Sequence, residues 1–294
     1  MSDVESTNAT AVASTDRSRR VRRVRRWALT AVVLYLLSLI MLVSLETALV
    51  YPRPPVESGD WAPAGLVYEA VDFTAADGTA LHGWFLEHPQ PRATILFFHG
   101  NAEQVAYLGD EMDALRQRYA ASVFVFDYRG YGKSEGTPNE AGVLLDGVAA
   151  QRWLAQRTNR KPDEIVLYGR SLGGAVAVAN ASTEGAALLV LDRTFHSMVE
   201  VAAGLHRWAP VRWLMRNRYP SSQRLAVYSG PLLQIHGIDD EFIPFASGKR
   251  LFEASPSQEK QFLAIDGLYH NDPIPPEFYL TLDSVMPRRE STSE

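Results

Sequence analysis

The chain has 294 residues, no cysteine, and 29 lysines and arginines against 34 aspartates and glutamates, which gives a formal net charge of −5 at pH 7. The acidic balance argues against nucleic acid as a partner, and the absence of cysteine excludes disulfides, thiolate zinc sites and a lipoprotein anchor. The length allows one domain of ordinary size together with a terminal extension.

The N-terminal extension reads as a polar segment followed by an apolar one. Residues 1–16 are rich in Ser, Thr, Asp and Ala, and we expect residues 1–26 to be a disordered, basic N-terminus. Residues 27–45 carry no charge and, as a helix, would extend about 28 Å at about 1.5 Å per residue. The hydrocarbon core of a bilayer is about 30 Å thick. Residues 27–50 are therefore predicted to be a transmembrane signal anchor, with the lipid bilayer as partner.

Arginines are concentrated on the N-terminal side of this apolar segment. They are Arg17, Arg19, Arg20, Arg22, Arg23, Arg25 and Arg26, against Arg53 soon after the segment. Positive charge favours the cytoplasmic side, so we expect a cytoplasmic N-terminus and an extracytoplasmic domain, at the periplasmic face of the inner membrane if the cell is Gram-negative.

A cleaved signal peptide and a twin-arginine export signal are the alternatives to a permanent anchor. A cleaved signal peptide has an apolar core of about 7 to 15 residues and small residues before the cut. The core is longer here, and the sequence LETA at residues 45–48 is a poor cleavage site. A twin-arginine export signal stays open, although the segment is more apolar than such a signal needs.

Beyond the apolar segment the pattern changes twice. Residues 51–63 contain four prolines, which predict a Pro-rich linker, extended and stiff, that holds the next domain away from the membrane. Residues 64–286 read as one domain, and the polar residues 287–294 as a loose tail.

The domain alternates strand and helix patterns. Residues 71–85 predict an antiparallel hairpin. Apolar strands are expected at residues 95–98, 123–126, 165–168, 188–191, 232–235 and 261–267, with helices after residue 102, over residues 140–156 and after residue 171. This βαβα alternation predicts an α/β fold with a mostly parallel central sheet and helices on both faces.

The sequence VLYGRSLGGAVAV at residues 166–178 is the strongest chemical signal in the chain. An apolar strand runs through Gly169, Ser171 and Gly173 directly into a helix, which is the pattern of a nucleophile elbow. A serine hydroxyl becomes a useful nucleophile only when a neighbouring base takes its proton. The two glycines lack the Cβ atoms that would collide at such a sharp turn. A glycine-rich turn with an incidental serine is the alternative, because the motif by itself is short.

A base and acids follow further along the chain. The strand at residues 232–235 opens into an acidic loop with Asp239, Asp240 and Glu241, and the strand at residues 261–267 is followed by His270. The carboxyl ends of parallel strands meet at one edge of the sheet, so these loops and Ser171 are expected to lie together. Asp192, at the end of an earlier strand, is a second candidate for the acid.

Six sequence blocks resemble the α/β-hydrolase superfamily, and most closely its membrane-anchored branch of serine hydrolases related to Bem46 and ABHD17. They are DGTALHGWF (77–85), FFHGNAE (97–103), FDYRGYGKSEGTP (126–138), YGRSLGG (168–174), IHGIDDEFIP (235–244) and YHND (269–272). The resemblance implies an α/β-hydrolase fold with a short cap, and it places the nucleophile on Ser171, the acid on Asp240 and the base on His270. The departures are Ile238, where a small hydroxyl residue is usual, and Tyr269, where glycine often precedes the histidine.

The same resemblance implies an oxyanion hole made of the backbone N–H groups of Leu172 and Asn101. His99 and His236 each precede a glycine at a strand end, and we interpret them as structural residues rather than catalytic or metal-binding ones. The chemistry needs no cofactor, and neither a cofactor nor a metal is expected.

The sequence favours a membrane-anchored esterase or thioesterase that acts on acyl ester, thioester or lipid-like substrates through an acyl-enzyme. A serine peptidase or amidase could use the same three residues. A catalytically inactive envelope binding or scaffold protein is the alternative from another class. Trp208, Trp213 and several arginines lie in the cap segment between residues 192 and 232, where they predict either a packed helix or an acyl-binding wall. The oligomeric state is not indicated.

Overall fold

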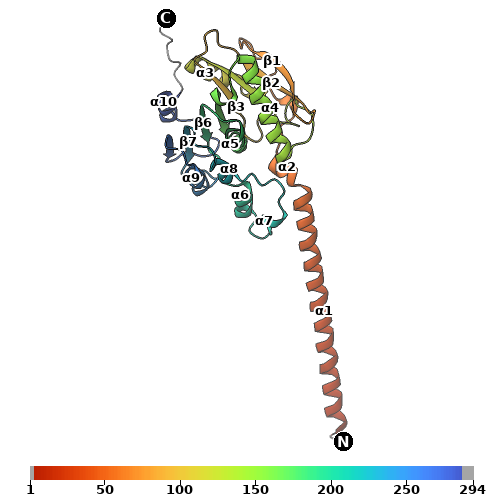
Figure 1. Ribbon diagram of the computed structural model, residues 1–294. Helices are drawn as coiled ribbons and strands as arrows, with labels where there is room; N and C mark the ends of the chain where they lie inside the picture. The colour runs from red at the N-terminus through yellow and green to blue at the C-terminus, as the bar shows by residue number, and fades with distance from the viewer. Residues whose placement is uncertain (1–2, 287–294) are drawn as a thin grey trace. The chain divides into compact units, whose positions relative to one another are not determined.

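The computed structural model describes residues 3–286, and its chain divides into two compact units that meet between Glu46 and Thr47. The first unit is helix α1 (Asp3–Ser44), the long red helix in Figure 1. The sequence predicts disorder up to residue 26, but the backbone is helical from Asp3. Extending an existing helix into alanine and arginine costs far less than starting a new one.

Within α1, Arg22–Ser44 is long and apolar enough to cross a membrane by length and composition. The sequence places this segment at residues 27–50, so the two boundaries differ. Helix α1 ends at Ser44, and the short helix α2 (Glu46–Val50) leads into the second unit, where Val50 is buried.

The second unit is built around an eight-stranded sheet with the order β1-β2-β4-β3-β5-β6-β7-β8. Strands β1 and β2 form an antiparallel hairpin, β2 is antiparallel to β4, and all other neighbours are parallel. The bounds are β1 (Glu69–Thr74), β2 (Ala80–Leu86), β3 (Ala93–Phe98), β4 (Ala121–Phe126), β5 (Val166–Arg170), β6 (Leu188–Asp192), β7 (Leu232–Gly237) and β8 (Lys260–Ile265). Both the expected hairpin and the mostly parallel sheet are confirmed.

Helices cover both faces of this sheet (Figure 1). Strands β3 and β4 are buried along their whole length, which explains why they read as continuous apolar runs. One face packs on α3 and α10, through Met112 and Phe278 against Phe97 and Val125. The other face packs on α4, whose Trp153 ring lies 4.5 Å from that of Phe124.

The remaining helices of the second unit have the following bounds. They are α3 (Gly109–Tyr119), α4 (Glu140–Thr158), α5 (Leu172–Glu184), α6 (Met198–Leu205), α7 (Val211–Leu214), α8 (Ser221–Leu225), α9 (Phe245–Ala254) and α10 (Pro276–Val285), with single 3₁₀ turns at Val56–Ser58, Val105–Tyr107 and Pro162–Glu164. The predicted short cap is the segment between β6 and β7, and it contains α6, α7 and α8.

The Pro-rich segment at residues 51–63 is not the free spacer that the sequence suggests. The Tyr51 side chain is buried, and its hydroxyl lies 2.9 Å from Asn217 Oδ1 and 2.8 Å from the Tyr219 hydroxyl. Further on, the Trp61 ring packs edge-on against Trp84 at 6.0 Å. Prolines keep the backbone extended, but the aromatic side chains between them gain enough from burial to fix the segment on the domain. The expected tail at residues 287–294 lies outside the described residues.

Candidate active site

Ser171 occupies a strained turn between β5 and α5. Its backbone angles are φ 53° and ψ −117°, in a region that residues with a Cβ rarely adopt. The turn is held on both sides: the Ser171 N–H donates to the Asp192 carbonyl at 2.9 Å, and the Ser171 carbonyl accepts from the Thr194 hydroxyl at 2.7 Å. The hydroxyl of Ser171 is thereby presented at the carboxyl end of β5.

The elbow glycines allow the strand and helix to approach this closely. A Cβ atom on Gly173 would lie 2.0 Å from the Phe98 carbonyl oxygen, and one on Gly169 would lie 2.5 Å from the Gly173 carbonyl oxygen. Both contacts are with backbone atoms that cannot move aside without shifting a strand or a helix. Only glycine fits at these two positions.

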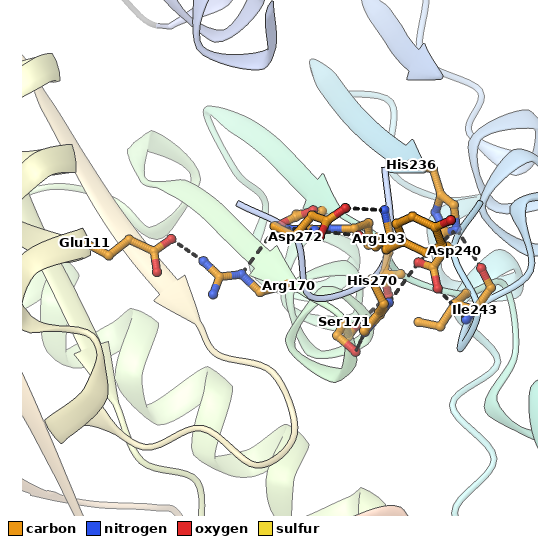
Figure 2. Close-up of polar contacts among 12 residues, drawn as sticks. Glu111, Arg170, Ser171, Arg193, His236, Asp240, Ile243, His270 and Asp272 are labelled. Atoms are coloured by element: carbon orange, nitrogen blue, oxygen red, sulfur yellow. Dashed lines mark hydrogen bonds and ion pairs between the residues drawn. The ribbon is translucent and has the colours of Figure 1, made fainter. Parts of the chain in front are cut away.

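The structure brings Ser171, His270 and Asp240 into one hydrogen-bonded line (Figure 2). His270 Nε2 lies 3.1 Å from Ser171 Oγ, and His270 Nδ1 lies 2.8 Å from Asp240 Oδ2. The three residues come from the loops after β5, β7 and β8, at one edge of the parallel sheet. When His270 donates its Nδ1 proton to Asp240, its Nε2 is left to accept the Ser171 proton.

Asp240 is fixed in its place by backbone donors. Its Oδ1 accepts hydrogen bonds from the N–H groups of Phe242 at 3.0 Å and Ile243 at 2.8 Å. Burial alone would raise the pKa of Asp240, but the hydrogen bonds from His270 and from the Ile243 N–H outweigh it and hold the pKa below its ordinary value. Asp240 is therefore ionised at neutral pH, as a group that stabilises an imidazolium must be.

The other candidate acids are engaged elsewhere. Asp239 accepts from the Gly267 N–H at 2.9 Å, and Glu241 accepts from the His270 N–H at 3.1 Å, so both brace loops rather than the imidazole ring. Asp192 forms a two-pronged ion pair with Arg193, with distances of 2.7 Å and 3.1 Å. Of the carboxylates considered from the sequence, Asp240 is the one that contacts the His270 ring.

The resemblance assigns an oxyanion hole to the backbone N–H groups of Leu172 and Asn101, and both residues lie next to Ser171. Leu172 is the first residue of α5, so its N–H has no partner within the helix and points with the positive end of the helix dipole. Gly100 packs against Ser171, because a Cβ on Gly100 would lie 3.5 Å from that of Ser171. The next residue, Asn101, is therefore beside Ser171, and within the described residues neither N–H donates a hydrogen bond.

The loop that carries Asn101 is braced by the chain that follows α2. The Asn101 side chain donates to the Val50 carbonyl at 2.8 Å and accepts from the Tyr131 hydroxyl at 3.0 Å. The Ala102 N–H donates to the Pro52 carbonyl at 3.0 Å. The segment between the first unit and the sheet is thus part of the support of this loop.

The contacts of His99 and His236 agree with a structural role for both residues. His99 Nδ1 lies 2.8 Å from the Gly100 carbonyl oxygen, and His236 Nε2 lies 2.9 Å from the Ile243 carbonyl oxygen. Both rings are fully buried, and burial lowers their pKa, so they stay neutral at pH 7. Over residues 3–286, no group of three or more His, Asp or Glu side chains could hold a metal ion.

The sequence did not reveal two arginines that lie beside the hydrogen-bonded line of Ser171, His270 and Asp240. Arg193 is buried, and while its Nε and one Nη bind Asp192, the other Nη donates to the carbonyls of Tyr269 at 3.0 Å and Asp272 at 2.7 Å (Figure 2). Those two carbonyls flank His270. Arg193 therefore ties the histidine loop to the end of β6, whose carbonyl also holds Ser171.

Arg170, the residue before the nucleophile, is the second of these arginines. It forms ion pairs with Glu103 at 2.8 Å and with Glu111, and its Nε lies 3.4 Å from Asp192. Glu103 in turn accepts from the Gly100 N–H at 2.6 Å. An arginine inside the elbow motif and an Asp-Arg pair at the end of β6 were the available signals, but neither spacing reveals which distant loop is bound.

The chain matches a family model, several sequence relatives and solved structures. A family model described as serine aminopeptidase, S33, matches residues 89–224, a range that includes Ser171 but ends before Asp240 and His270. An uncharacterized protein of Mycobacterium tuberculosis is 36% identical over 211 residues, which are 71% of this chain and 74% of that protein.

A sequence relative and a solved structure are also similar to this chain. Protein bem46 of Schizosaccharomyces pombe is 30% identical over 248 residues, covering 77% of this chain and 80% of bem46. The solved structure of the Pyrococcus furiosus esterase Pf2001 is similar with a TM-score of 0.66 and 21% identity, over 79% of this chain and 97% of the esterase. At that identity the likeness concerns the fold alone.

We predict that Arg193→Met lowers kcat for acyl-ester hydrolysis by about 100-fold with little change in KM, because misplacing a catalytic group by about 1 Å costs about that much. The variant also leaves Asp192 with one arginine fewer, which destabilises the fold. The double variant Asp192→Asn/Arg193→Met removes that charge, so we expect it to recover thermal stability but not kcat. Turnover at the wild-type rate in a folded Arg193→Met chain would contradict a positioning role.

Proposed function

We propose, because the chain belongs to the Bem46-like branch of the α/β-hydrolase family, that it is a serine hydrolase that cleaves carboxylic ester or thioester bonds of acyl substrates. The observation that carries the proposal is the hydrogen-bonded line from Ser171 through His270 to Asp240, with distances of 3.1 Å and 2.8 Å. Nucleophile, base and orienting acid are within reach of one another without any rearrangement.

The proposed reaction follows from this geometry. Ser171 Oγ attacks the acyl carbon while His270 Nε2 takes its proton, and the imidazolium then protonates the leaving alcohol or thiol. Asp240 holds the ring in the required tautomer and stabilises its positive charge. The N–H groups of Leu172 and Asn101 stabilise the oxyanion. Water, activated by the same imidazole, releases the acid from the acyl-enzyme and restores the serine.

Peptide or amide hydrolysis is the second candidate, because the matching family model describes a serine aminopeptidase. An aminopeptidase must bind a protonated α-amino group, which requires carboxylates close to the site. Within the cap, residues 196–219 instead contain four arginines and a single acid, Glu200. Glu200 is already paired with Arg212 at 2.8 Å. The cap therefore offers no unpaired carboxylate for a peptide N-terminus, and the two acids beside the His270 loop, Asp239 and Glu241, each accept a backbone N–H.

We further propose that helix α1 anchors the protein in a bilayer, with the N-terminus in the cytoplasm and the second unit outside it. The length and apolar composition of Arg22–Ser44 support a single span, and the seven arginines between residues 17 and 26 support this orientation. In a Gram-negative cell the hydrolase would face the periplasm.

Fluorophosphonate labelling tests the nucleophile. We expect the full chain in detergent to label covalently, and Ser171→Ala to lose both labelling and ester hydrolysis, the latter by about 10⁴-fold to 10⁶-fold. Ser182→Ala, on the same helix α5, is the matched control and should label like the wild type. A folded wild type that never labels, or equal labelling of Ser171→Ala, would favour the inactive scaffold.

Matched substrates test the bond that is cleaved. The p-nitrophenyl ester and the p-nitroanilide of the same short fatty acid differ only in the leaving group, and an aminoacyl p-nitroanilide adds a free amine. We expect kcat/KM for the ester to exceed both anilides by several orders of magnitude. Faster turnover of the aminoacyl anilide would reverse the preference and assign the chain to the aminopeptidases.

A reporter at the C-terminus tests the orientation in a bacterial host. Alkaline phosphatase becomes active only outside the cytoplasm, so we expect a fusion after residue 294 to be active. Replacing four of the arginines before the helix by glutamine should lower that activity, because fewer positive charges then favour the cytoplasmic side. An inactive phosphatase fusion, with an active cytoplasmic reporter at the same place, would contradict the proposed orientation.

A further inference from the structure

The cap presents large apolar side chains to solvent. We define the cap face as Leu205, Arg207, Trp208, Arg212 and Trp213, which lie on and between helices α6 and α7. Trp213 is 89% exposed, Leu205 64% and Trp208 52%. Two tryptophans and a leucine at these exposures lose much of the free energy that burial of an aromatic or aliphatic side chain provides.

Helix packing fixes the direction in which Trp213 points. Val211 and Met215 are buried, and residues four apart lie on one side of a helical turn, so this side of α7 faces the domain. Trp213 and Arg212 are left on the outer side. A groove of about 490 Å³ runs between α6 and α7, with Arg207, Arg212 and Trp213 in its walls. A packed helix, one of the two alternatives expected from the sequence, does not account for a tryptophan this exposed.

The charge of the cap is opposite to that of the whole chain. Residues 196–219 contain four arginines, at positions 207, 212, 216 and 218, and one acid, Glu200, whereas the chain carries a net charge of −5. Arg207 and Arg212 are exposed beside Trp213, and Arg212 is paired with Glu200 at 2.8 Å, so the net positive charge of the cap face comes from Arg207. An amphipathic face of tryptophan, leucine and arginine is the composition of surfaces that lie in the headgroup region of a bilayer.

The entry of the chain into the second unit lies next to the cap. Tyr51, the residue after helix α2, binds Asn217 and Tyr219 at the end of the cap, with distances of 2.9 Å and 2.8 Å. One residue earlier, the Val50 carbonyl binds the Asn101 side chain. Only residues 45 and 46 separate the end of helix α1 from the second unit. A chain that leaves a membrane at the end of α1 therefore enters the domain between the cap and the candidate oxyanion loop.

We infer that the cap face is a docking surface for the anionic headgroups of the same bilayer that holds helix α1. The inference rests on the proposed membrane anchor. Trp213 and Leu205 enter the headgroup region, while Arg207 lies against a lipid phosphate. A second copy of the chain is a poorer occupant, because two such faces would bring like charges together.

Docking of the cap face on the bilayer would make the membrane interface the source of the substrate. The cap is inserted between β6 and β7 and emerges from the carboxyl ends of the strands, the same edge that carries Ser171 and His270. A cap that lies on lipid holds this edge toward the membrane surface. The substrate class of the proposed hydrolase is then an acyl ester or thioester that resides in the bilayer interface.

The absence of cysteine makes a direct test practical, because a single introduced cysteine can be labelled without background. Trp213→Cys and Leu280→Cys would each carry an environment-sensitive nitrobenzoxadiazole probe in the full-length chain. Leu280 lies on α10 and is 68% exposed, and Figure 1 shows α10 well separated from α6 and α7 within the second unit. The labelled chains are placed in nanodiscs of phosphatidylcholine, with or without phosphatidylglycerol, that contain lipids with a headgroup-proximal doxyl quencher.

We expect strong quenching of the probe at position 213, weak quenching at position 280, and an increase at position 213 when phosphatidylglycerol is present. Arg207→Gln should lower the docked-to-undocked ratio about fivefold in phosphatidylglycerol, whereas Arg92→Gln, which removes the same charge before β3, should leave it unchanged.

Equal quenching at the two positions in nanodiscs that contain the protein would overturn the docking surface alone. Protection of position 213 from a soluble quencher only in nanodiscs that hold two chains would identify a second copy as the occupant and overturn it too. Failure of the chain to enter nanodiscs would overturn the anchor itself.

Discussion

The close approach of helix α5 to strand β3 is the constraint on which the rest of the site depends. At Gly173 there is no room for a Cβ atom, since it would lie 2.0 Å from the Phe98 carbonyl oxygen. This contact forces the strand-to-helix turn to be sharp, and the turn places Ser171 at φ 53°. The strain is offset by hydrogen bonds to Asp192 and Thr194 and by the burial of α5. The Ser171 hydroxyl and the first N–H of α5 consequently lie close together.

Buried charge then connects this elbow to the two loops that complete the relay. Asp192 lies at the centre: its backbone holds Ser171, and its carboxylate holds Arg193, which binds the carbonyls on both sides of His270. Arg170 and Glu103 extend the network to the Gly100 N–H. Charged groups out of water are costly unless they are paired, so the network has few alternative arrangements and gives a defined geometry rather than added stability. Asp192, the second candidate for the acid, therefore positions the loops and does not contact the His270 ring.

The sequence was sufficient for the parts of the molecule that depend on local pattern. Apolar runs and the elbow motif predicted the mostly parallel sheet, and the strand ends predicted which loops would meet; the resemblance to Bem46-like α/β hydrolases is confirmed. It was insufficient where distant segments decide the outcome. Prolines at residues 51–63 suggested a spacer, but the burial of Tyr51 against Asn217 and Tyr219 cannot be read from spacing. The binding of Arg193 to the histidine loop is equally non-local. The exposure of Trp213 could not be predicted either. The local sequence does not decide whether this side of α7 packs on the domain or faces solvent.

The central claim is that three loops converge so that Ser171, His270 and Asp240 act as one relay beside two N–H donors. The most direct measurement is an experimental structure of the full-length chain after reaction with a fluorophosphonate. The account predicts a phosphorus bonded to Ser171 Oγ, a phosphonyl oxygen within hydrogen-bonding distance of both the Leu172 and Asn101 N–H groups, and His270 still bound to Asp240. A phosphonyl oxygen directed away from both donors, or a His270 ring bound to another carboxylate, would contradict it.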